Sequence, residues 1–529
     1  MFRLEYLKVN NHPQLGDLEL YLSENNEVKN VSKPYTSVII GPNGTGKSYI
    51  LKTIADVFRQ FKTYSDTEEK KFNLPFDVHL RYQFYHNTYE IVTRKLKNLN
   101  KASRKRYLFF KNRPIEKEFY NKESDLEIIT DFEVLHQELE YPEKLLVNSI
   151  IPTDRFVWQS SSPTDFYQYL GVRSTSSTTS TKSSSRRTIR HLFNATSSNT
   201  EFTNTLKELL KFLDFEESFK VHYTTKINKL FFSGALTEDN FKKYFEEWWD
   251  DKFEFSKRKK ENPLWSIPYY NNNFRDNKKE LKKIIDYLNA ISNEVGRLQH
   301  KKNSSAKIIS IDLFDTNTSE LDLGMIGHLE NLDIVNLDGI KIKKSNSELS
   351  INEVSSGEYH LLISLIGIFA NISKDSLVLI DEPEISLHPN WQMRYVTFLK
   401  NVFSKYGNCQ FILTTHSHFL VSDLEGKTSS ITALTREPVT NKLIASLMDK
   451  SDTYGWSAEE VLYNVFKVKT VRNYFLEADL TDLLGMISEN SKDKKRIQEL
   501  LKTIQSINIS SNDPMNAVIE ETNAYLKTI

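Results

Sequence analysis

A glycine-rich loop near the start of the chain constrains the fold more than any other feature. The segment GPNGTGKS at residues 41–48 follows the β-branched run YTSVII and precedes a helical pattern. A strand, a tight turn and a helix in this order form a phosphate-binding loop, because backbone N–H groups and the helix N-terminus point at one anion. The chain has only 16 glycines in 529 residues, so composition does not explain three of them within six positions. The helix is predicted to face a sheet with Ile50, Leu51, Ile54, Val57, Phe58 and Phe61.

Each residue type in this loop suits phosphate. Glycines let the backbone fold around the anion, Lys47 supplies positive charge to the β- and γ-phosphates, and Ser48 offers a hydroxyl to Mg²⁺. The predicted nucleotide-binding residues are Gly41, Pro42, Asn43, Gly44, Thr45, Gly46, Lys47 and Ser48. A glycine-rich turn without a ligand is the alternative interpretation.

An apolar strand that ends in two carboxylates supplies a second part of the site. The segment LVLIDEPE places Asp381 and Glu382 at the carboxyl end of the strand, where open α/β sheets bind ligands. Asp381 is predicted to hold Mg²⁺, and Glu382 to orient or deprotonate the attacking water. Solvated acids at a strand end are the alternative, which the nearby phosphate-binding loop disfavours.

These two motifs resemble the Walker A and Walker B motifs of ATP-binding-cassette ATPases, and more closely those of their repair, chromosome-maintenance and overcoming-lysogenisation-defect branch. VSSGE at residues 354–358 is similar to the signature that reaches across a head-to-tail dimer to the other subunit's γ-phosphate. TTHS at residues 414–417 is similar to the histidine switch of the family. The alternatives are a plain helix cap and a surface histidine. The resemblance implies nucleotide contacts by Ser355, Ser356, Gly357 and Glu358, and γ-phosphate sensing by His416.

Departures from the transporter form favour one branch of this superfamily. Ser356 replaces a second signature glycine, and Lys47 lies 308 residues before Ser355. The phrase DEPEISLHPNWQ at residues 381–392 resembles the ATPases of prokaryotic anti-phage systems, notably the Septu type and its retron-associated relatives. PTDRF at residues 152–156 is similar to a segment of those ATPases. Three residues are candidates for the functional residue of the family's glutamine loop. In order of preference they are Asp154, Gln159 and Gln83.

The resemblance implies an ATP-binding-cassette head, and the remaining sequence predicts an α/β fold with a mixed sheet, an antiparallel β-subdomain and a large, mainly helical insertion. Alternating segments before residue 94 indicate the antiparallel strands. Strand and helix alternation after residue 351 indicates a parallel sheet. Residues 203–300 have helical periodicity without a sustained heptad. The predicted divisions are 1–156 and 346–450 for the two parts of the head, 157–345 for a Ser/Thr-rich loop and the insertion, and 451–529 for a helical C-terminal region.

Charge and cysteine content narrow the functional classes. Seventy Lys and Arg balance seventy Asp and Glu, and Cys409 is the single cysteine. One thiol cannot form an internal disulfide, which together with the short apolar runs predicts a soluble cytoplasmic protein. The neutral total conceals two basic tracts without acids, at which a nucleic acid or an acidic partner would be sought: residues 94–113 hold nine Lys or Arg, and residues 173–190 hold five.

The predicted function is that of an ATPase subunit of an anti-phage defence complex. The resemblance implies ATP and Mg²⁺ as cofactors and a homodimer or higher even oligomer. The chain after Val421 lacks the Glu-Gly strand end, the later Asp-x-Asp and the clustered histidines of nuclease domains, so an effector nuclease, HNH-type by the resemblance, is expected as a separate partner. The alternative is a DNA-repair or chromosome-maintenance ATPase that clamps DNA, with tract 94–113 neutralising phosphates and its aromatic residues packing on sugar or base. A membrane-transporter subunit is disfavoured by the 308-residue separation.

Overall fold

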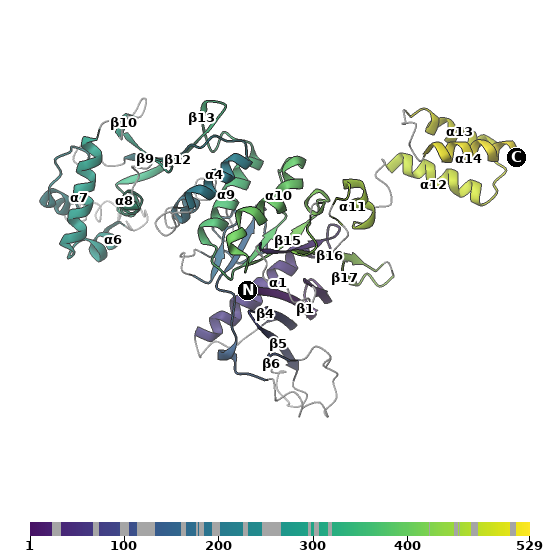
Figure 1. Cartoon of the computed structure of the whole chain (residues 1–529), viewed down its shortest axis with the longest axis horizontal. Coiled ribbons are helices and arrows are strands. Elements are labelled where there is room, and N and C mark those ends of the chain that lie inside the picture. Colours follow the sequence, from purple (N-terminus) through teal and green to yellow (C-terminus); the bar gives the residue numbers. More distant parts are fainter. Residues whose placement is uncertain are drawn as a thin grey trace, which may run out of the picture. The chain divides into compact units, whose positions relative to one another are not determined.

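The computed structural model consists of two compact units, Met1–Gly455 and Trp456–Ile529 (Figure 1). Each unit is described by itself, and the predicted divisions inside the first unit remain predictions. The described residues are 1–23, 33–66, 74–95, 105–113, 133–159, 165–175, 178, 185–192, 202–225, 231–245, 266–294, 298–300, 306–315, 320–422, 424–437, 439–448, 453, 455–466, 474–507 and 515–528.

A seven-stranded sheet occupies the centre of the first unit. Its strands are β3 (Tyr35–Ile40), β7 (Leu145–Ser149), β8 (Tyr167–Tyr169), β14 (Leu377–Asp381), β15 (Gln410–Thr415), β16 (Ser429–Arg436) and β17 (Leu443–Leu447). They lie in the order β17-β16-β3-β15-β14-β7-β8, and all neighbours are parallel except β16 and β17. Asp381 pairs with Thr414 on one side and with Ser149 on the other, so three strand ends meet at one edge.

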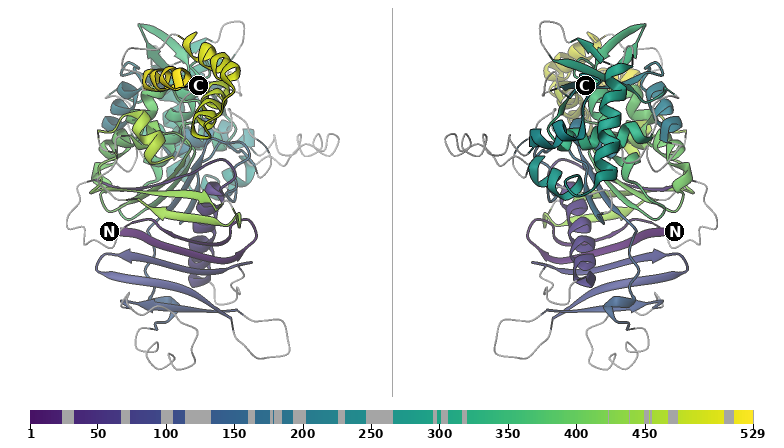
Figure 2. Two further views of the ribbon diagram at one scale, coloured as in Figure 1. Left: turned by 90° about the vertical axis from the view of Figure 1, so that its right-hand side faces the viewer. Right: turned by 90° about the vertical axis from the view of Figure 1, so that its left-hand side faces the viewer.

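The predicted antiparallel subdomain is confirmed. Its strands are β1 (Phe2–His12), β2 (Gly16–Tyr21), β4 (Asp77–Phe84), β5 (Asn87–Lys95) and β6 (Lys105–Lys111), in the order β2-β1-β4-β5-β6. Helix α1 (Lys47–Asp66) packs against this sheet and the central sheet, and all six predicted apolar positions are fully buried in one shared core (Figure 2). A short 3₁₀ turn, η3 (His136–Glu138), precedes β7.

Other helices cover the central sheet. They are α4 (Phe202–Phe212), α9 (Ser356–Asn371) and α10 (Pro389–Val402), followed by the 3₁₀ turns η4 (Ser404–Tyr406) and η5 (Phe419–Val421). Helix α4 contacts both α9 and α10, and the Phe212 and Phe398 rings stack with centroids 3.8 Å apart. Helices α9 and α10 lie in the chain before and after β14, which confirms the predicted strand and helix alternation.

The insertion contains helices and a sheet that the sequence did not predict. The helices are α6 (Ser266–Asn273), α7 (Lys278–Asn293) and α8 (Glu320–Asn331). The strands are β9 (Phe219–Thr225), β10 (Leu298–His300), β11 (Lys307–Asp312), β12 (Val335–Lys344) and β13 (Ser347–Ser350), all antiparallel in the order β10-β11-β9-β12-β13. Strand β9 lies within the stretch of predicted helical periodicity. Its alternation buries Phe219, Val221 and Tyr223 on one face, which is the period-two signal of a strand.

The second unit is helical, as its pattern predicts. It contains α11 (Ala458–Asn464), α12 (Tyr474–Ser488), α13 (Lys494–Gln505) and α14 (Met515–Thr528). The last three helices share a small core formed by Leu476, Leu483, Ile497, Leu500, Ile504 and Met515. In the described ranges of both units, every helix is too short or too polar to cross a bilayer.

Candidate active site

The phosphate-binding loop has the backbone that its glycines predict. Residues 41–46 connect the end of β3 to the start of α1. Gly44 and Gly46 have φ values of +79° and +85°, a left-handed conformation that glycine adopts without steric cost. A Cβ atom on Gly46 would lie 2.5 Å from Cδ2 of Leu15, so a side chain here would require the Leu15 side chain to shift. The Thr45 hydroxyl donates to the Pro42 carbonyl at 2.8 Å and closes the turn.

Lys47 places a buried ammonium group at the centre of the loop. Its Nζ donates to the carbonyls of Gly41 at 2.9 Å and Pro42 at 3.3 Å, and lies 2.6 Å from Nε2 of His416. Burial lowers the pKa of Lys47 to about 8, although nearby carboxylates, Glu382 foremost, oppose this shift. The ammonium is therefore poorly solvated, so an anion brought close to it would be held strongly.

Asp381 and Ser48 form an oxygen donor set beside the loop. Oδ1 of Asp381 accepts hydrogen bonds from the Ser48 hydroxyl at 3.0 Å and the Thr414 hydroxyl at 2.6 Å. Burial raises the pKa of Asp381, and both hydrogen bonds oppose the rise. The described residues contain no group of three His, Cys, Asp or Glu that could hold a metal by themselves. This set fits Mg²⁺, which takes one or two protein oxygens and completes its shell with phosphate oxygens and water.

Two glutamates contact His416, one through its ring and the other through its backbone N–H. Oε1 of Glu382 lies 3.1 Å from the His416 ring nitrogen Nε2, and this hydrogen bond is the main cause that lowers the pKa of Glu382. Oε1 of Glu384 accepts the His416 backbone N–H at 2.6 Å. Glu382 has a φ of +46°, which is costly for a residue with a side chain and is typical of functional sites. The sequence alone did not indicate that Glu384 would bind the His416 backbone. The available signal was its position two residues after Glu382.

The predicted signature segment begins helix α9. The Ser355 side chain accepts the Glu358 N–H at 3.3 Å, and the Ser355 N–H donates to the Glu358 carboxylate at 2.9 Å. This reciprocal pair is a capping box, so the helix-cap alternative is present in the structure, whereas nucleotide contact stays a prediction. A Cβ atom on Gly357 would lie 2.2 Å from the Ser386 carbonyl oxygen, so the loop after β14 passes directly against this helix.

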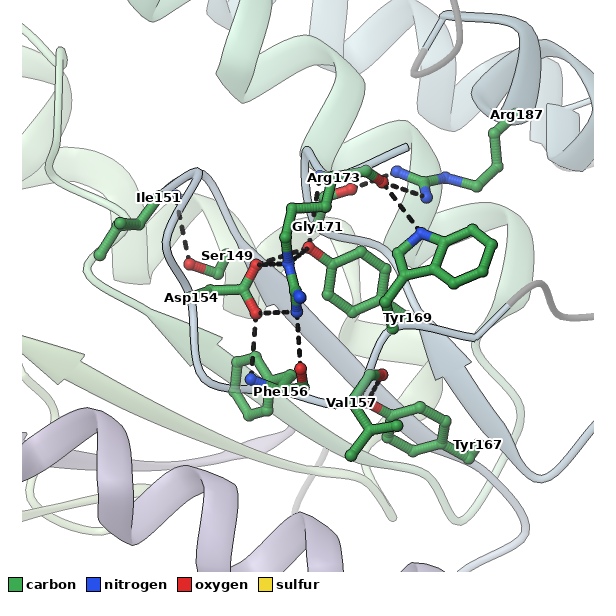
Figure 3. Close-up of polar contacts among 11 residues, drawn as sticks. Ser149, Ile151, Asp154, Phe156, Val157, Tyr167, Tyr169, Gly171, Arg173 and Arg187 are labelled. Carbon is green, nitrogen blue, oxygen red and sulfur yellow. Dashed lines mark hydrogen bonds and ion pairs between the residues drawn. The ribbon is translucent and has the colours of Figure 1, made fainter. Parts of the chain in front are cut away.

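Asp154, the first candidate for the glutamine loop, is enclosed by hydrogen-bond donors (Figure 3). Its Oδ2 accepts from Nε of Arg173 at 2.9 Å and from the Tyr169 hydroxyl at 2.5 Å. Its Oδ1 accepts from Nη2 of Arg173 at 2.6 Å and from the Phe156 N–H at 3.0 Å. Both carboxylate oxygens are therefore committed to contacts inside the protein.

The other two candidates for that loop lie elsewhere. Gln83 is in β4 of the antiparallel sheet, where its backbone pairs with Arg3 and Thr88. Gln159 is exposed at the end of a described range. The structure therefore brings together Lys47, Ser48, Asp381, Glu382 and His416 of the predicted residues, whereas the carboxylate of Asp154 is bound by Arg173 and Tyr169.

The aromatic residues of basic tract 94–113 are packed inside the protein. The rings of Tyr107 and Phe109 each lie 5.7 Å from the ring of Phe61, and Phe110 is fully buried. Arg113 forms an ion pair with the buried Glu90. The side chains of residues 94–106 lie outside the described part of the structure, as does most of the Ser/Thr segment between Arg173 and Ser185.

Sequence comparison matches most of the chain to one family. The model of the AAA ATPase domain family matches residues 3–421. The Retron Vc95 probable ATPase of Vibrio cholerae serotype O1 biovar El Tor is 30% identical over 182 residues, which cover 28% of this chain and 33% of the relative. The Septu protein PtuA of Bacillus thuringiensis is 25% identical over 181 residues, which cover 29% of this chain and 41% of the relative. The Retron Ec83 probable ATPase of Escherichia coli is 33% identical over 87 residues, which cover 14% of this chain and 16% of the relative.

The chain thus spans less than half the length of each of these curated relatives. Solved structures of SMC head domains also align. One from Pyrococcus furiosus has a TM-score of 0.34 at 13% identity and covers 85% of this chain and 97% of its own. One from Thermotoga maritima has a TM-score of 0.33 at 12% identity, and the alignment covers 84% of this chain and 98% of the solved chain. Scores at this level carry no argument about function or assembly.

Proposed function

Because this chain belongs to the AAA ATPase domain family, we propose that it binds ATP with Mg²⁺ at residues 41–48 and hydrolyses it. The observation that carries this proposal is the meeting of Lys47, Ser48, Asp381, Glu382 and His416, joined by contacts of 2.6 to 3.1 Å. A cation for phosphate, an oxygen pair for Mg²⁺ and a carboxylate for water are the parts that phosphoryl transfer needs.

In the proposed reaction, a water oxygen bonds to the γ-phosphorus while the bond from that phosphorus to the β–γ bridging oxygen breaks. ADP leaves with the electron pair of that bond, and the proton of the water passes to Glu382 or to solvent. The pKa of Glu382 is lowered by its bond to His416, which keeps the carboxylate ionised and able to accept a hydrogen bond from water. Mg²⁺ held by Ser48 and Asp381 would neutralise phosphate charge.

The biological setting is proposed from the resemblance and the partial matches. The phrase at residues 381–392 resembles ATPases of anti-phage systems, and the Septu and retron relatives match part of the chain. The protein would act in the cytoplasm as a head-to-tail homodimer or higher even oligomer, with Ser355, Ser356, Gly357 and Glu358 facing ATP on the partner subunit. Its nucleotide state would control a separate effector nuclease, HNH-type by the resemblance.

The DNA-clamping alternative loses part of its support. It relied on aromatic residues of tract 94–113 that pack on sugar or base, and Tyr107, Phe109 and Phe110 pack inward instead. No described residue favours that function specifically.

The test is a comparison of the parental protein with Lys47→Ala. The parental protein should bind ATP and release phosphate only with Mg²⁺, and Lys47→Ala should lose binding or turnover. Equal turnover in both proteins would contradict the ATPase assignment. Copurification of a nuclease encoded beside this chain tests the defence assignment separately, which fails if neither a nuclease nor another toxic effector is found there.

A further inference from the structure

The loop after β7 exposes one arginine between two buried residues. Asp154 and Phe156 are 8% and 4% exposed, whereas Arg155 between them is exposed. Because Asp154 and Phe156 both turn into the protein, the side chain between them is left on the outer side of the loop. Arg155 is therefore open to solvent, whereas its two neighbours in the chain are not.

Hydrogen bonds fix this loop from both of its flanks (Figure 3). Besides its ion pair with Asp154, Arg173 donates through Nη2 to the Phe156 carbonyl at 2.6 Å. The Asp154 N–H donates to the Ile151 carbonyl at 3.2 Å. Arg187 donates to the Arg173 carbonyl at 3.0 Å and to the Gly171 carbonyl. A loop held in this way presents its outer side chain with little further loss of conformational entropy.

Arg155 lies beside the phosphate-binding helix. Its guanidinium carbon is 5.5 Å from the centroid of the Tyr49 ring, and Tyr49 directly follows Ser48. The loop leaves the sheet at the strand end that carries Asp381, because Ser149 and Asp381 are paired.

Charge at the site favours an additional cation. The carboxylates of Asp381, Glu382 and Glu384 all act electrostatically on the ammonium of Lys47. A triphosphate adds several negative charges to this set, so a further positive group reduces repulsion inside a poorly solvated site. Among the described residues, the contact of Arg155 is with the Tyr49 ring and not with a carboxylate. Stacking on a ring leaves the guanidinium N–H groups free to form a forked pair with phosphate.

We propose that Arg155 is a second phosphate-binding cation of this nucleotide site, which contacts the terminal phosphate of ATP, and that Asp154 and Arg173 position it. This inference rests on the proposed ATPase function. Arg155 is thus a catalytic residue, since it touches the transferred group, whereas Asp154 and Arg173 act through the loop.

The test compares Arg155→Ala, Arg155→Lys and a matched control, Arg59→Ala. The Arg59 guanidinium also lies over a tyrosine ring, that of Tyr167 at 5.8 Å, but it is ten residues, or about 15 Å, further along α1 than Tyr49. Equilibrium titration gives the affinities for ATP and ADP, and steady-state kinetics give kcat and KM. Loss of a charge-assisted contact to the terminal phosphate should weaken ATP binding or turnover about ten- to hundredfold in Arg155→Ala.

The affinity for ADP should change by less than about twofold in Arg155→Ala, because ADP lacks the terminal phosphate. Arg155→Lys should recover part of the loss, since a point charge replaces the fork, and Arg59→Ala should behave as the parental protein. Unchanged ATP affinity and kcat in Arg155→Ala, while Lys47→Ala is inactive, would overturn this inference and leave the ATPase proposal standing. Equal losses for ATP and ADP with a lowered unfolding temperature would also overturn it. A parental protein that does not bind ATP would overturn both.

Positioning is tested with Asp154→Asn. This variant should lose ATP affinity selectively over ADP, and combining it with Arg155→Ala should add no further loss, because both changes act on one contact. Additive losses would refute the positioning role. Tyr169→Phe removes only the hydroxyl that donates to Asp154 at 2.5 Å, so it provides the same comparison if Asp154→Asn does not fold.

Discussion

Lys47 should make ATP binding depend on pH in the weakly alkaline range. Burial among the Gly41 and Pro42 carbonyls and the His416 ring lowers the pKa of Lys47 to about 8. The protonated ammonium is the form that attracts phosphate. The free protein loses this proton as pH rises through about 8, whereas the nucleotide complex retains it because the phosphates stabilise the charge. Affinity is therefore highest below that pH and falls above it.

The size of the effect follows from the protonated fraction. With a pKa of about 8, about nine tenths of the free protein carries the Lys47 proton at pH 7 and about one tenth carries it at pH 9. The apparent Kd is the intrinsic Kd divided by the competent fraction, so it should rise about tenfold over this interval. That change is about 1.4 kcal/mol of binding free energy.

Equilibrium titration with ATP between pH 7 and pH 9.5 measures this change. The terminal phosphate of a nucleotide is almost fully ionised across this range, because its last pKa is about 6, so the ligand contributes little to the slope. Lys47→Arg is the control: its guanidinium stays charged, and whatever affinity it retains should not vary with pH. A parental Kd that stays constant over this range would refute the reasoning about Lys47.

Three further substitutions test other parts of the site. Glu382→Gln should lower turnover about 10²- to 10⁴-fold while it still binds ATP, and should accumulate an ATP-loaded assembly in size-exclusion chromatography; the parental rate would contradict its proposed role. Gly357→Ala places a Cβ atom 2.2 Å from a backbone oxygen and should lower both the unfolding temperature and turnover. Gly367→Ala on the same helix meets its nearest atom at 3.8 Å and should lower neither, so matching behaviour would count against this packing argument. Ser48→Ala should raise the Mg²⁺ concentration needed for half-maximal turnover without weakening ATP binding in EDTA; an unchanged Mg²⁺ requirement would exclude the hydroxyl as a ligand.

The convergence of the site was predictable because it follows from strand direction. Lys47, Asp381 and His416 each follow a short apolar strand, and parallel strands end at the same edge of a sheet. The bond between the Glu384 carboxylate and the His416 N–H was not predictable, since it depends on the backbone path of the loop after β15. Residue types identify the chemistry of such a site, whereas local backbone geometry decides which side chain reaches which atom.

The insertion was harder to predict because its sheet forms between distant segments. Strand β9 pairs with β11 and β12, which begin more than eighty residues later in the chain. Local composition around β9 is rich in Lys, Glu and Phe, which also suits helices, so propensity alone favours the wrong structure there. The alternation FKVHYTT was the one local signal for a strand.

Three arginines of the basic tracts already have partners inside the protein. The two basic tracts include Arg113, Arg173 and Arg187. In the structure, Arg173 neutralises Asp154, Arg113 neutralises Glu90, and Arg187 donates to two carbonyls, so each is an internal partner. A guanidinium already paired with a carboxylate, as in Arg173 and Arg113, offers little attraction to a nucleic acid. The exposed Arg155, outside both tracts, therefore gives a better reason to look for a phosphate ligand than these three residues do.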